Sequence, residues 1–256
     1  MPAGTRRVLA ALAASTALAL SGALTAAPVY AAPTADDIRI DSFVVNGGKP
    51  VVVGTKGVVK FPLSLTATHA SGVYQAFAYL FGSYAFLDED QHQLDCAGTK
   101  PTTTCTGTYT LDPVKEFYQD NSPAGVWEVR VHVDAWETSY DNRGDYTFKV
   151  LRASKLTANA TPEPVKKGRT ITVKGTLTHA DWSVDKYVGV KNRSVKLQFR
   201  KKGGTGYTTV KTVRTGKGGA VTATTTAGSD GYYRFVYGGT GTTAAVTSSG
   251  DFIDVQ

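Results

Sequence analysis

Residues 231–237, close to the end of the chain, alternate strictly between the two sides of an extended strand. Tyr233, Phe235 and Tyr237 fall on one side, and the residues between them fall on the other. A strand with an aromatic face needs a second sheet to cover that face. Runs with this two-residue period recur through the chain and helical periods are scarce, so the sequence predicts an all-β fold.

The first half of the chain repeats this pattern at residues 125–133, where Trp127 and Val129 point to the same side. In both stretches a polar turn and a glycine lead to an aromatic residue two positions later. This repetition, in a chain of 256 residues, predicts two Ig-like β-sandwich domains in tandem, over residues 36–152 and 155–256.

Two prolines predict local departures from regular central strands. Asp112 followed by Pro113 predicts an N-cap and one turn of helix as far as Phe117. Pro62 interrupts an alternating run and favours an edge strand or a bulge, because proline donates no hydrogen bond to a neighbouring strand.

Six aromatic residues crowd the segment from Val73 to Leu87. Aromatic residues favour strands, and Gly82 in the middle predicts two strands around a bulge. The rings are either buried core, which is the commoner role of such residues, or an aromatic binding face.

Charge divides the chain at the same place as the predicted domains. Residues 36–153 carry 10 Lys and Arg against 15 Asp and Glu, whereas residues 154–256 carry 16 against 6. No long Pro, Gly or Ser linker separates the two halves, so we expect a tight joint. The charge asymmetry concerns partners and solubility and does not decide the fold.

The first 31 residues have the features of a cleaved secretory signal peptide. Arg6 and Arg7 precede an apolar run over residues 8–24, and Ala31 ends a small-x-small cleavage pattern. A retained membrane anchor is the alternative. We expect a mature protein without a transmembrane segment, secreted or associated with the cell wall, and the export route (general secretory or twin-arginine) stays open.

The two cysteines, Cys96 and Cys105, enclose a turn-rich segment. In an exported chain such a close pair predicts a disulfide across the end of a hairpin. A metal or redox role needs further ligands or a C-x-x-C spacing, and the sequence has neither.

Four stretches of the second half resemble a bacterial Ig-like module, namely Pro164–Gly168, Ile171–Gly175, Val195–Arg200 and Asp230–Phe235. Modules of this kind recur in exported actinobacterial proteins of unassigned function. The resemblance covers residues 155–256, and the first half is similar only as a divergent Ig-like sandwich. It implies a fold and brings no catalytic residue with it.

Motifs of catalysis are missing from the sequence. It has no nucleophile elbow, zinc-protease motif or phosphate-binding glycine loop, and its four histidines lack ligand spacing. We therefore predict a protein that is not an enzyme and needs no cofactor. His132 falls on the outward face of the strand at residues 125–133, where we expect it to be solvated.

Carboxylates give the best metal candidates. They crowd two stretches, one with Asp88, Asp90 and Asp95 and another with Asp141 and Asp145. Calcium takes several oxygen ligands from loops, so either stretch is a candidate Ca²⁺ site, with a solvated acidic loop as the alternative. Neither matches the EF-hand spacing.

Two ligand classes fit the remaining side chains. Trp136, Trp182 and the aromatic segment are candidate stacking platforms for carbohydrate. The basic half, with Arg200 and Lys202 among its charges, is suited to anionic polymers of the cell envelope, although lysines on strand edges also prevent aggregation. Nucleic acid is disfavoured because aromatic residues do not interleave with the lysine clusters.

These observations lead to three hypotheses of function. The first is a non-enzymatic secreted or cell-surface protein for binding or adhesion, whose basic domain contacts anionic polymers and whose acidic loops bind calcium. The second is a carbohydrate-binding or enzyme-accessory module. The third is a secreted hydrolase inhibitor that uses the loop between the cysteines. The sequence leaves the specific ligand and the oligomeric state open.

Overall fold

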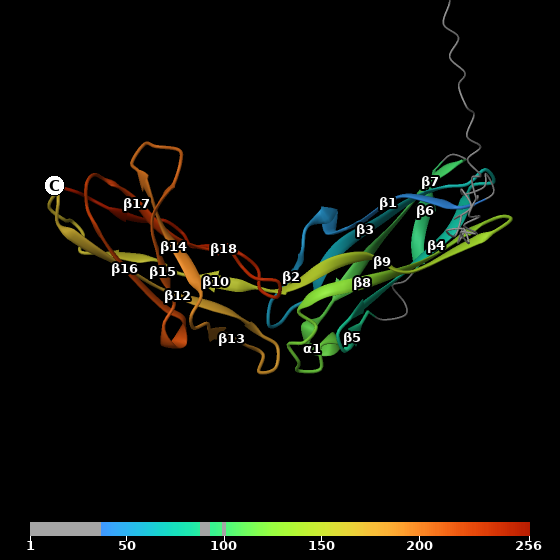
Figure 1. The fold of residues 1–256 in the computed structure, drawn as a ribbon, viewed down its shortest axis with the longest axis horizontal. Helices are drawn as coiled ribbons and strands as arrows, with labels where there is room; N and C mark the ends of the chain where they lie inside the picture. Colours follow the sequence, from blue (N-terminus) through green and yellow to red (C-terminus); the bar gives the residue numbers. More distant parts are fainter. Residues whose placement is uncertain (1–36, 88–92, 99–100) are drawn as a thin grey trace, which may run out of the picture. The chain divides into compact units, whose positions relative to one another are not determined.

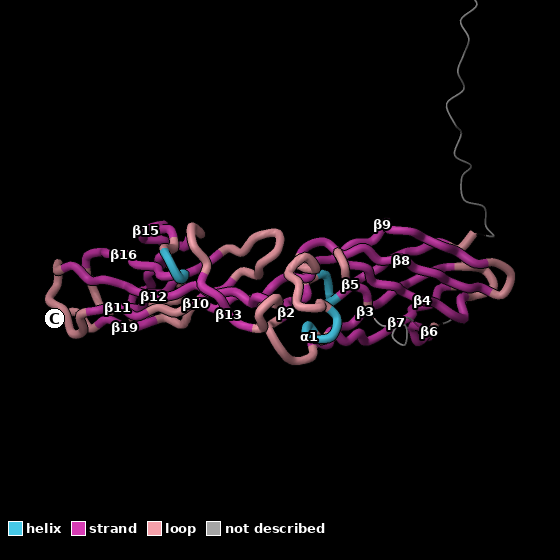
Figure 2. Tube along the Cα trace, turned by 90° about the horizontal axis from the view of Figure 1, so that it is seen from below, coloured by secondary structure: helices cyan, strands magenta, loops and turns pink. Residues whose placement is uncertain are grey.

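The computed structural model describes residues 37–87, 93–98 and 101–256, and only the backbone of residues 142–145. The predicted signal peptide, residues 1–31, lies outside the described residues. Strands make up almost all of the regular structure (Figures 1 and 2), which confirms the all-β prediction. All of the described residues belong to a single compact unit.

The first half is a sandwich of nine strands. They are β1 (Arg39–Val45), β2 (Val51–Val53), β3 (Val59–Thr68), β4 (Val73–Gly82), β5 (Ala85–Phe86), β6 (Gln93–Ala97), β7 (Thr102–Leu111), β8 (Gly125–Ala135) and β9 (Ser139–Arg152). The strands form one continuous hydrogen-bonded order, β1-β3-β7-β6-β4-β8-β9-β2, with β5 beside β4. It folds into two layers, β1-β3-β7-β6 and β4-β8-β9-β2, which are joined where β6 pairs with β4. This is the strand order of an Ig-type sandwich, in which strands A, B, E and D face strands C, F and G.

Buried side chains from both layers fill the space between them. Phe61 on β3 packs 6.0 Å from Phe148 on β9, measured between ring centroids. The Tyr109 hydroxyl on β7 donates a hydrogen bond of 2.8 Å to the Ala78 carbonyl on β4, so that the two layers are also joined by a polar contact. Burial raises the pKa of Tyr109, which keeps this hydroxyl protonated and able to donate.

The second half is a sandwich of two five-stranded sheets. Its strands are β10 (Ser154–Leu156), β11 (Asn159–Thr161), β12 (Thr170–Asp181), β13 (Lys186–Gly189), β14 (Ser194–Lys201), β15 (Thr208–Arg214), β16 (Ala220–Thr226), β17 (Gly231–Tyr237), β18 (Val246–Thr247) and β19 (Asp251–Ile253). In one sheet β12 pairs with β10, β11, β13 and β16. In the other, β17 pairs with β14, β18 and β19, and β15 pairs with β14.

The alternating stretch at the end of the chain forms β17, as the sequence predicts. Tyr233, Phe235 and Tyr237 are buried in the core of the second sandwich, where residues of both sheets surround them. The equivalent strand β8 buries Trp127 and Val129 in the first sandwich. Both halves therefore build their cores around an aromatic residue two positions after a glycine.

The structure confirms the short helix and corrects the expectation that Pro62 marks an edge strand. Helix α1 (Pro113–Glu116) begins at Asp112, whose side chain accepts a hydrogen bond of 3.1 Å from the Val114 backbone. Strand β3 is not an edge strand, because it lies between β1 and β7. Pro62 is tolerated there since β1 pairs with β3 only from Leu63 onward.

The joint between the halves is one residue long. Strand β9 ends at Arg152 and β10 begins at Ser154, so only Ala153 lies between them. The Ala153 backbone donates to the Val53 carbonyl and accepts from the Ala180 amide, each at 2.8 Å. This agrees with the expected tight joint, whereas the division into separate domains at residues 152 and 155 stays a prediction.

Candidate functional site

The predicted disulfide is present between Cys96 on β6 and Cys105 on β7. The two residues are direct partners in the antiparallel register, so the bond joins neighbouring strands at the end of a hairpin. Cys105 is buried in the first core. The disulfide is therefore a structural link.

The five candidate calcium ligands do not form a group within the described residues. Asp88 and Asp90 lie outside those residues, as does the side chain of Asp145. Asp95 is an exposed residue of β6, and Asp141 lies in strand β9 where a loop was expected. Among the described side chains no group of three potential ligands is arranged so that it could hold a metal ion, and calcium binding stays a prediction.

Asp141 instead contacts His132 on the neighbouring strand β8. The His132 ring approaches Asp141 through Nδ1 at 2.7 Å and Asp134 through Nε2 at 3.0 Å. The hydrogen bond to Asp141, supported by the charge of Asp134, raises the pKa of His132. The expected solvated histidine is thus held between two carboxylates, a contact that depends on the register of β8 and β9.

Trp182 is wrongly predicted as an exposed stacking platform. Its side chain is 1% exposed, and its ring lies 4.2 Å from that of Phe117. The indole nitrogen donates a hydrogen bond of 2.7 Å to the carbonyl of Gly54. Trp182 lies in the turn between β12 and β13, which inserts the indole into the core of the first sandwich.

The aromatic residues of β4 face outward. Ala76, Ala78 and Leu80 are fully buried. The aromatic residues that alternate with them are partly exposed, namely Phe77, Tyr79 and Phe81. The interpretation of this segment as buried core is therefore wrong for these rings. A strand that served only the core would place its large rings inside, since burying such a side chain stabilises the fold by about 1.5–3 kcal/mol.

We name this surface the aromatic face. It consists of Tyr74, Phe77, Tyr79 and Phe81 on β4, together with Trp136, whose ring packs against that of Tyr74. Along β4 the rings at positions 77 and 79 are nearly parallel, with centroids 6.4 Å apart. Strand β8 lines the rings with charged side chains. The Arg130 guanidinium lies 4.4 Å from the centre of the ring at position 81, and the His132 ring lies 6.0 Å from that at position 77.

Trp136 lies at the end of the aromatic face, just beyond β8, and is 68% exposed. Its ring packs 4.8 Å from that of Tyr74, which is 48% exposed, at an interplanar angle of 31°. Each ring holds the other in place while leaving much of its surface accessible. This position suits the predicted role of Trp136 in ligand binding.

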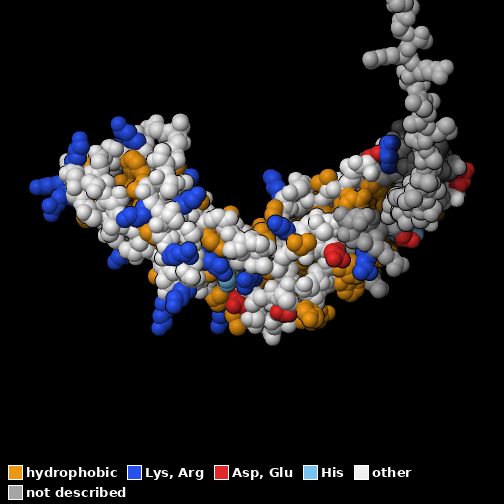
Figure 3. Space-filling model, in the orientation of Figure 1, with side chains coloured by type: hydrophobic (Ala, Val, Ile, Leu, Met, Phe, Trp, Pro, Cys, Tyr) orange, Lys and Arg blue, Asp and Glu red, His pale blue; other side chains and the backbone are white. Residues whose placement is uncertain are grey.

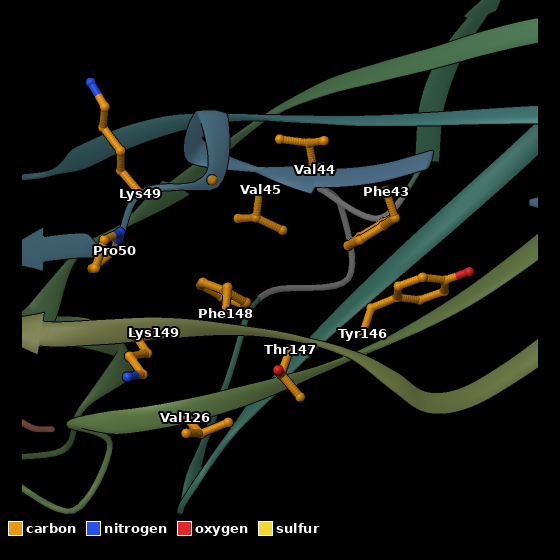
Figure 4. Close-up of a pocket in the computed structure, with 11 residues that line it drawn as sticks. Phe43, Val44, Val45, Lys49, Pro50, Val126, Tyr146, Thr147, Phe148 and Lys149 are labelled. Carbon is orange, nitrogen blue, oxygen red and sulfur yellow. The ribbon is translucent and has the colours of Figure 1, made fainter. Parts of the chain in front are cut away.

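A groove of about 660 Å³ opens on another side of the first sandwich, between β1 and β9 (Figure 4). Val45 and Phe148 point into it, and the rings of Phe43 and Tyr146 pack against each other at one end of it, with centroids 4.7 Å apart. Two lysines are the only charged residues of its lining. Its mainly apolar lining with a few polar groups is typical of pockets that bind ligands.

The second sandwich carries the basic surface. Lys and Arg side chains gather over the part of the molecule where Figure 1 labels β12–β17 (Figure 3). Of the residues that the structure describes, Lys202 is the only basic residue of this half with a carboxylate at ion-pair distance, 3.4 Å from Asp230. Most of this positive charge is therefore uncompensated by neighbouring carboxylates.

Comparisons with known proteins add no assignment. No family model and no curated protein matches the chain. Solved structures that align with it include latent PorU from Porphyromonas gingivalis (TM-score 0.29, 13% identity, 85% of this chain and 20% of that one). Others are the D00-D0 domain of intimin (0.30, 13%, 83% and 99%) and the fibronectin(III)-like modules of CbhA from Clostridium thermocellum (0.34, 10%, 86% and 93%).

The chain thus spans a fifth of the length of PorU. With TM-scores this low, the Ig-like assignment rests on the strand order described above. Within the described residues no helix has the length and apolar character needed to cross a membrane.

Proposed function

We propose that this chain is a non-enzymatic binding protein that acts outside the cell and holds a neutral polysaccharide on its aromatic face. The observation that carries the proposal is the orientation of β4. This strand buries the small side chains of Ala76 and Ala78 and directs its aromatic side chains outward. The Cys96–Cys105 disulfide supports an oxidising, extracellular location.

The chemistry of the aromatic face favours a neutral sugar chain. Aromatic rings offer flat apolar surfaces to the C–H faces of sugar rings, and the exposed Tyr74–Trp136 pair presents two such rings. The carboxylates of Glu128 and Asp134, on the same face of β8, are acceptors for sugar hydroxyl groups. Because residues 36–153 are acidic overall, an anionic polymer would be repelled from this half.

Affinity electrophoresis in gels that contain hydroxyethylcellulose, glucomannan or mixed-linkage β-glucan tests the proposal, together with sedimentation on insoluble cellulose and chitin. The double variant Tyr74→Ala/Trp136→Ala removes the exposed pair. Each aromatic contact is worth about 0.5–1.5 kcal/mol beyond area burial. Losing two contacts costs about 1–3 kcal/mol together and therefore weakens binding by about five- to 150-fold.

Tyr118→Ala is the matched control, because Tyr118 is 80% exposed and is not one of the five residues of the aromatic face. It lines a pocket with Gly82 and Phe86, at the opposite end of β4 from the Tyr74–Trp136 pair. The control variant should bind as the unmodified protein does. Binding that survives loss of the pair, or that falls equally in the control, would contradict the proposal, as would the absence of binding to every neutral polysaccharide tested.

A further inference from the structure

The outer face of the β14–β17 sheet combines arginine side chains with aromatic rings from several strands. Arg200 on β14 lies opposite Tyr232 on β17, and Gln198 lies opposite Arg234. Tyr207 comes from the segment before β15. Arg200 and Tyr232 are 32 positions apart in the sequence and meet only through the register of the sheet, so the expectation for the lysine clusters did not anticipate this contact.

The side chains form a continuous row. The Arg234 guanidinium lies 3.6 Å from the centre of the Tyr207 ring. Arg200 lies between two rings, 5.2 Å from that of Tyr207 and 4.4 Å from that of Tyr232. The Tyr232 ring in turn packs 5.2 Å from the ring of Phe252. We call these five residues the arginine–tyrosine row.

Neutral groups position both guanidinium groups. Arg234 Nε donates a hydrogen bond of 2.9 Å to the side-chain carbonyl of Gln198, and Arg200 Nη1 donates one of 2.8 Å to the Gly204 carbonyl. No carboxylate of the described chain lies within ion-pair distance of either arginine. Each guanidinium has five N–H donors, so most of its donors and its whole charge are left for a ligand.

The row therefore has the properties of a preformed anion site. Stacking on a ring uses the flat face of a guanidinium and leaves its in-plane N–H groups directed at carboxylate, sulfate or phosphate oxygens. Because ring contacts and neutral hydrogen bonds already hold Arg200 and Arg234, less side-chain entropy is lost when a ligand binds.

From this geometry, we propose that the arginine–tyrosine row is a second binding site of the protein, and that its ligand is an acidic polysaccharide. Two arginines near each other suit a polymer with repeated anionic groups. Exposed threonines of the neighbouring strand β15, among them Thr209 and Thr212, provide hydroxyl groups for hydrogen bonds with a sugar chain.

Single-stranded nucleic acid fits the row less well. Proteins bind single strands by stacking bases on open aromatic faces. Here the Tyr207 ring is already covered by Arg234, and the Tyr232 ring lies between Arg200 and Phe252. The row recognises anionic groups along a chain and has few open ring faces for bases.

Isothermal titration with polygalacturonate, dextran sulfate and a phosphate-bearing glycan tests the site and separates the three anionic groups. Neutral dextran and a single-stranded oligonucleotide serve as comparators. In the double variant Arg200→Gln/Arg234→Gln, affinity for at least one acidic polysaccharide should fall tenfold or more. The control Arg169→Gln/Lys174→Gln removes the same charge from the β12 region and should change affinity less than twofold.

A second variant, Arg200→Lys/Arg234→Lys, keeps the charge but removes the planar fork of donors. Its affinity for acidic polysaccharide should fall severalfold. If a thermal melt shows that the glutamine variant is unfolded, the affinity of the lysine variant decides the test. Equal losses in the control, full affinity in the lysine variant, tighter binding of the oligonucleotide, or no binding of any acidic polysaccharide would overturn the proposal. The Tyr74→Ala/Trp136→Ala variant should bind acidic polysaccharide normally, so this site and the aromatic face can fail independently.

Discussion

Replacing Trp182 with alanine should destabilise the protein strongly, although this residue belongs to a turn. The indole is almost completely buried against Phe117 and contributes to the core of the first sandwich. Truncating a buried tryptophan to alanine costs about 3–5 kcal/mol, through lost apolar burial and the cavity left behind. In urea, with a slope of about 1–3 kcal/mol per molar, the midpoint of unfolding should fall by more than 1 M.

Two further variants divide this effect into its parts. Trp182→Phe keeps an aromatic ring at the position but leaves the Gly54 carbonyl without its donor. Gly54 is only half-buried, so losing this bond costs about 1 kcal/mol, the lower end of the range for an unsatisfied acceptor, and this variant should be intermediate. Trp136→Ala removes the same type of side chain from an exposed position and should change stability by no more than about 0.5 kcal/mol.

Equilibrium urea unfolding, followed by fluorescence and circular dichroism, measures all three variants under the same conditions. A midpoint for Trp182→Ala that equals that of Trp136→Ala would refute the buried position of the indole. The reasoning would also fail if Trp182→Phe were as unstable as the alanine variant, since the ring contact with Phe117 would then contribute nothing.

Three other variants probe single features of the first sandwich. Replacing both cysteines with serine should lower stability by about 3 kcal/mol, the chain-entropy value for a closed loop of this size, measured by thermal melting with and without reductant. Gly82→Ala should cost about 1–3 kcal/mol, because a Cβ there would come within 2.4 Å of the Trp127 ring; Gly206→Ala, which has open space around it, is its control. Because the folded pKa of His132 is raised, its protonated form stabilises the fold fully below about pH 6.5, and this contribution disappears as the pH rises through the raised pKa. In Asp141→Asn the pKa of His132, measured by NMR titration, should fall; an unchanged value would contradict the contact.

Local sequence patterns were sufficient for much of the fold. The alternation around Trp127 and Phe235 predicted which side chains are buried, because the two-residue period of a strand fixes its faces. Asp112 and Pro113 likewise predicted the start of α1, since capping depends on adjacent residues.

Features that depend on distant parts of the chain could not be predicted in this way. Trp182 has the sequence surroundings of an exposed loop residue, and its burial depends on Gly54 and Phe117, more than 60 residues away. In β4 both faces are apolar, so that periodicity does not tell the buried alanines from the outward rings. The order of strands decides which face meets the core.

The contacts of the arginine–tyrosine row were missed for the same reason. Arg200 and Tyr232 are direct partners across two strands, yet 32 positions separate them in the chain. The one available signal was the outward position of Arg234 within its alternating strand. A search for aromatic residues near lysines in the sequence could not detect a row that is assembled by sheet register.

The single residue between β9 and β10 has a mechanical consequence. Under the proposed function, pulling on a bound polymer would put tension on the chain, and a flexible linker between the two halves would lengthen first. Here Ala153 can add at most about 3.6 Å of extension, and its own amide and carbonyl are already engaged with Val53 and Ala180. Tension applied along the chain would therefore act directly on these backbone hydrogen bonds, and the joint would transmit force between the two halves without first extending.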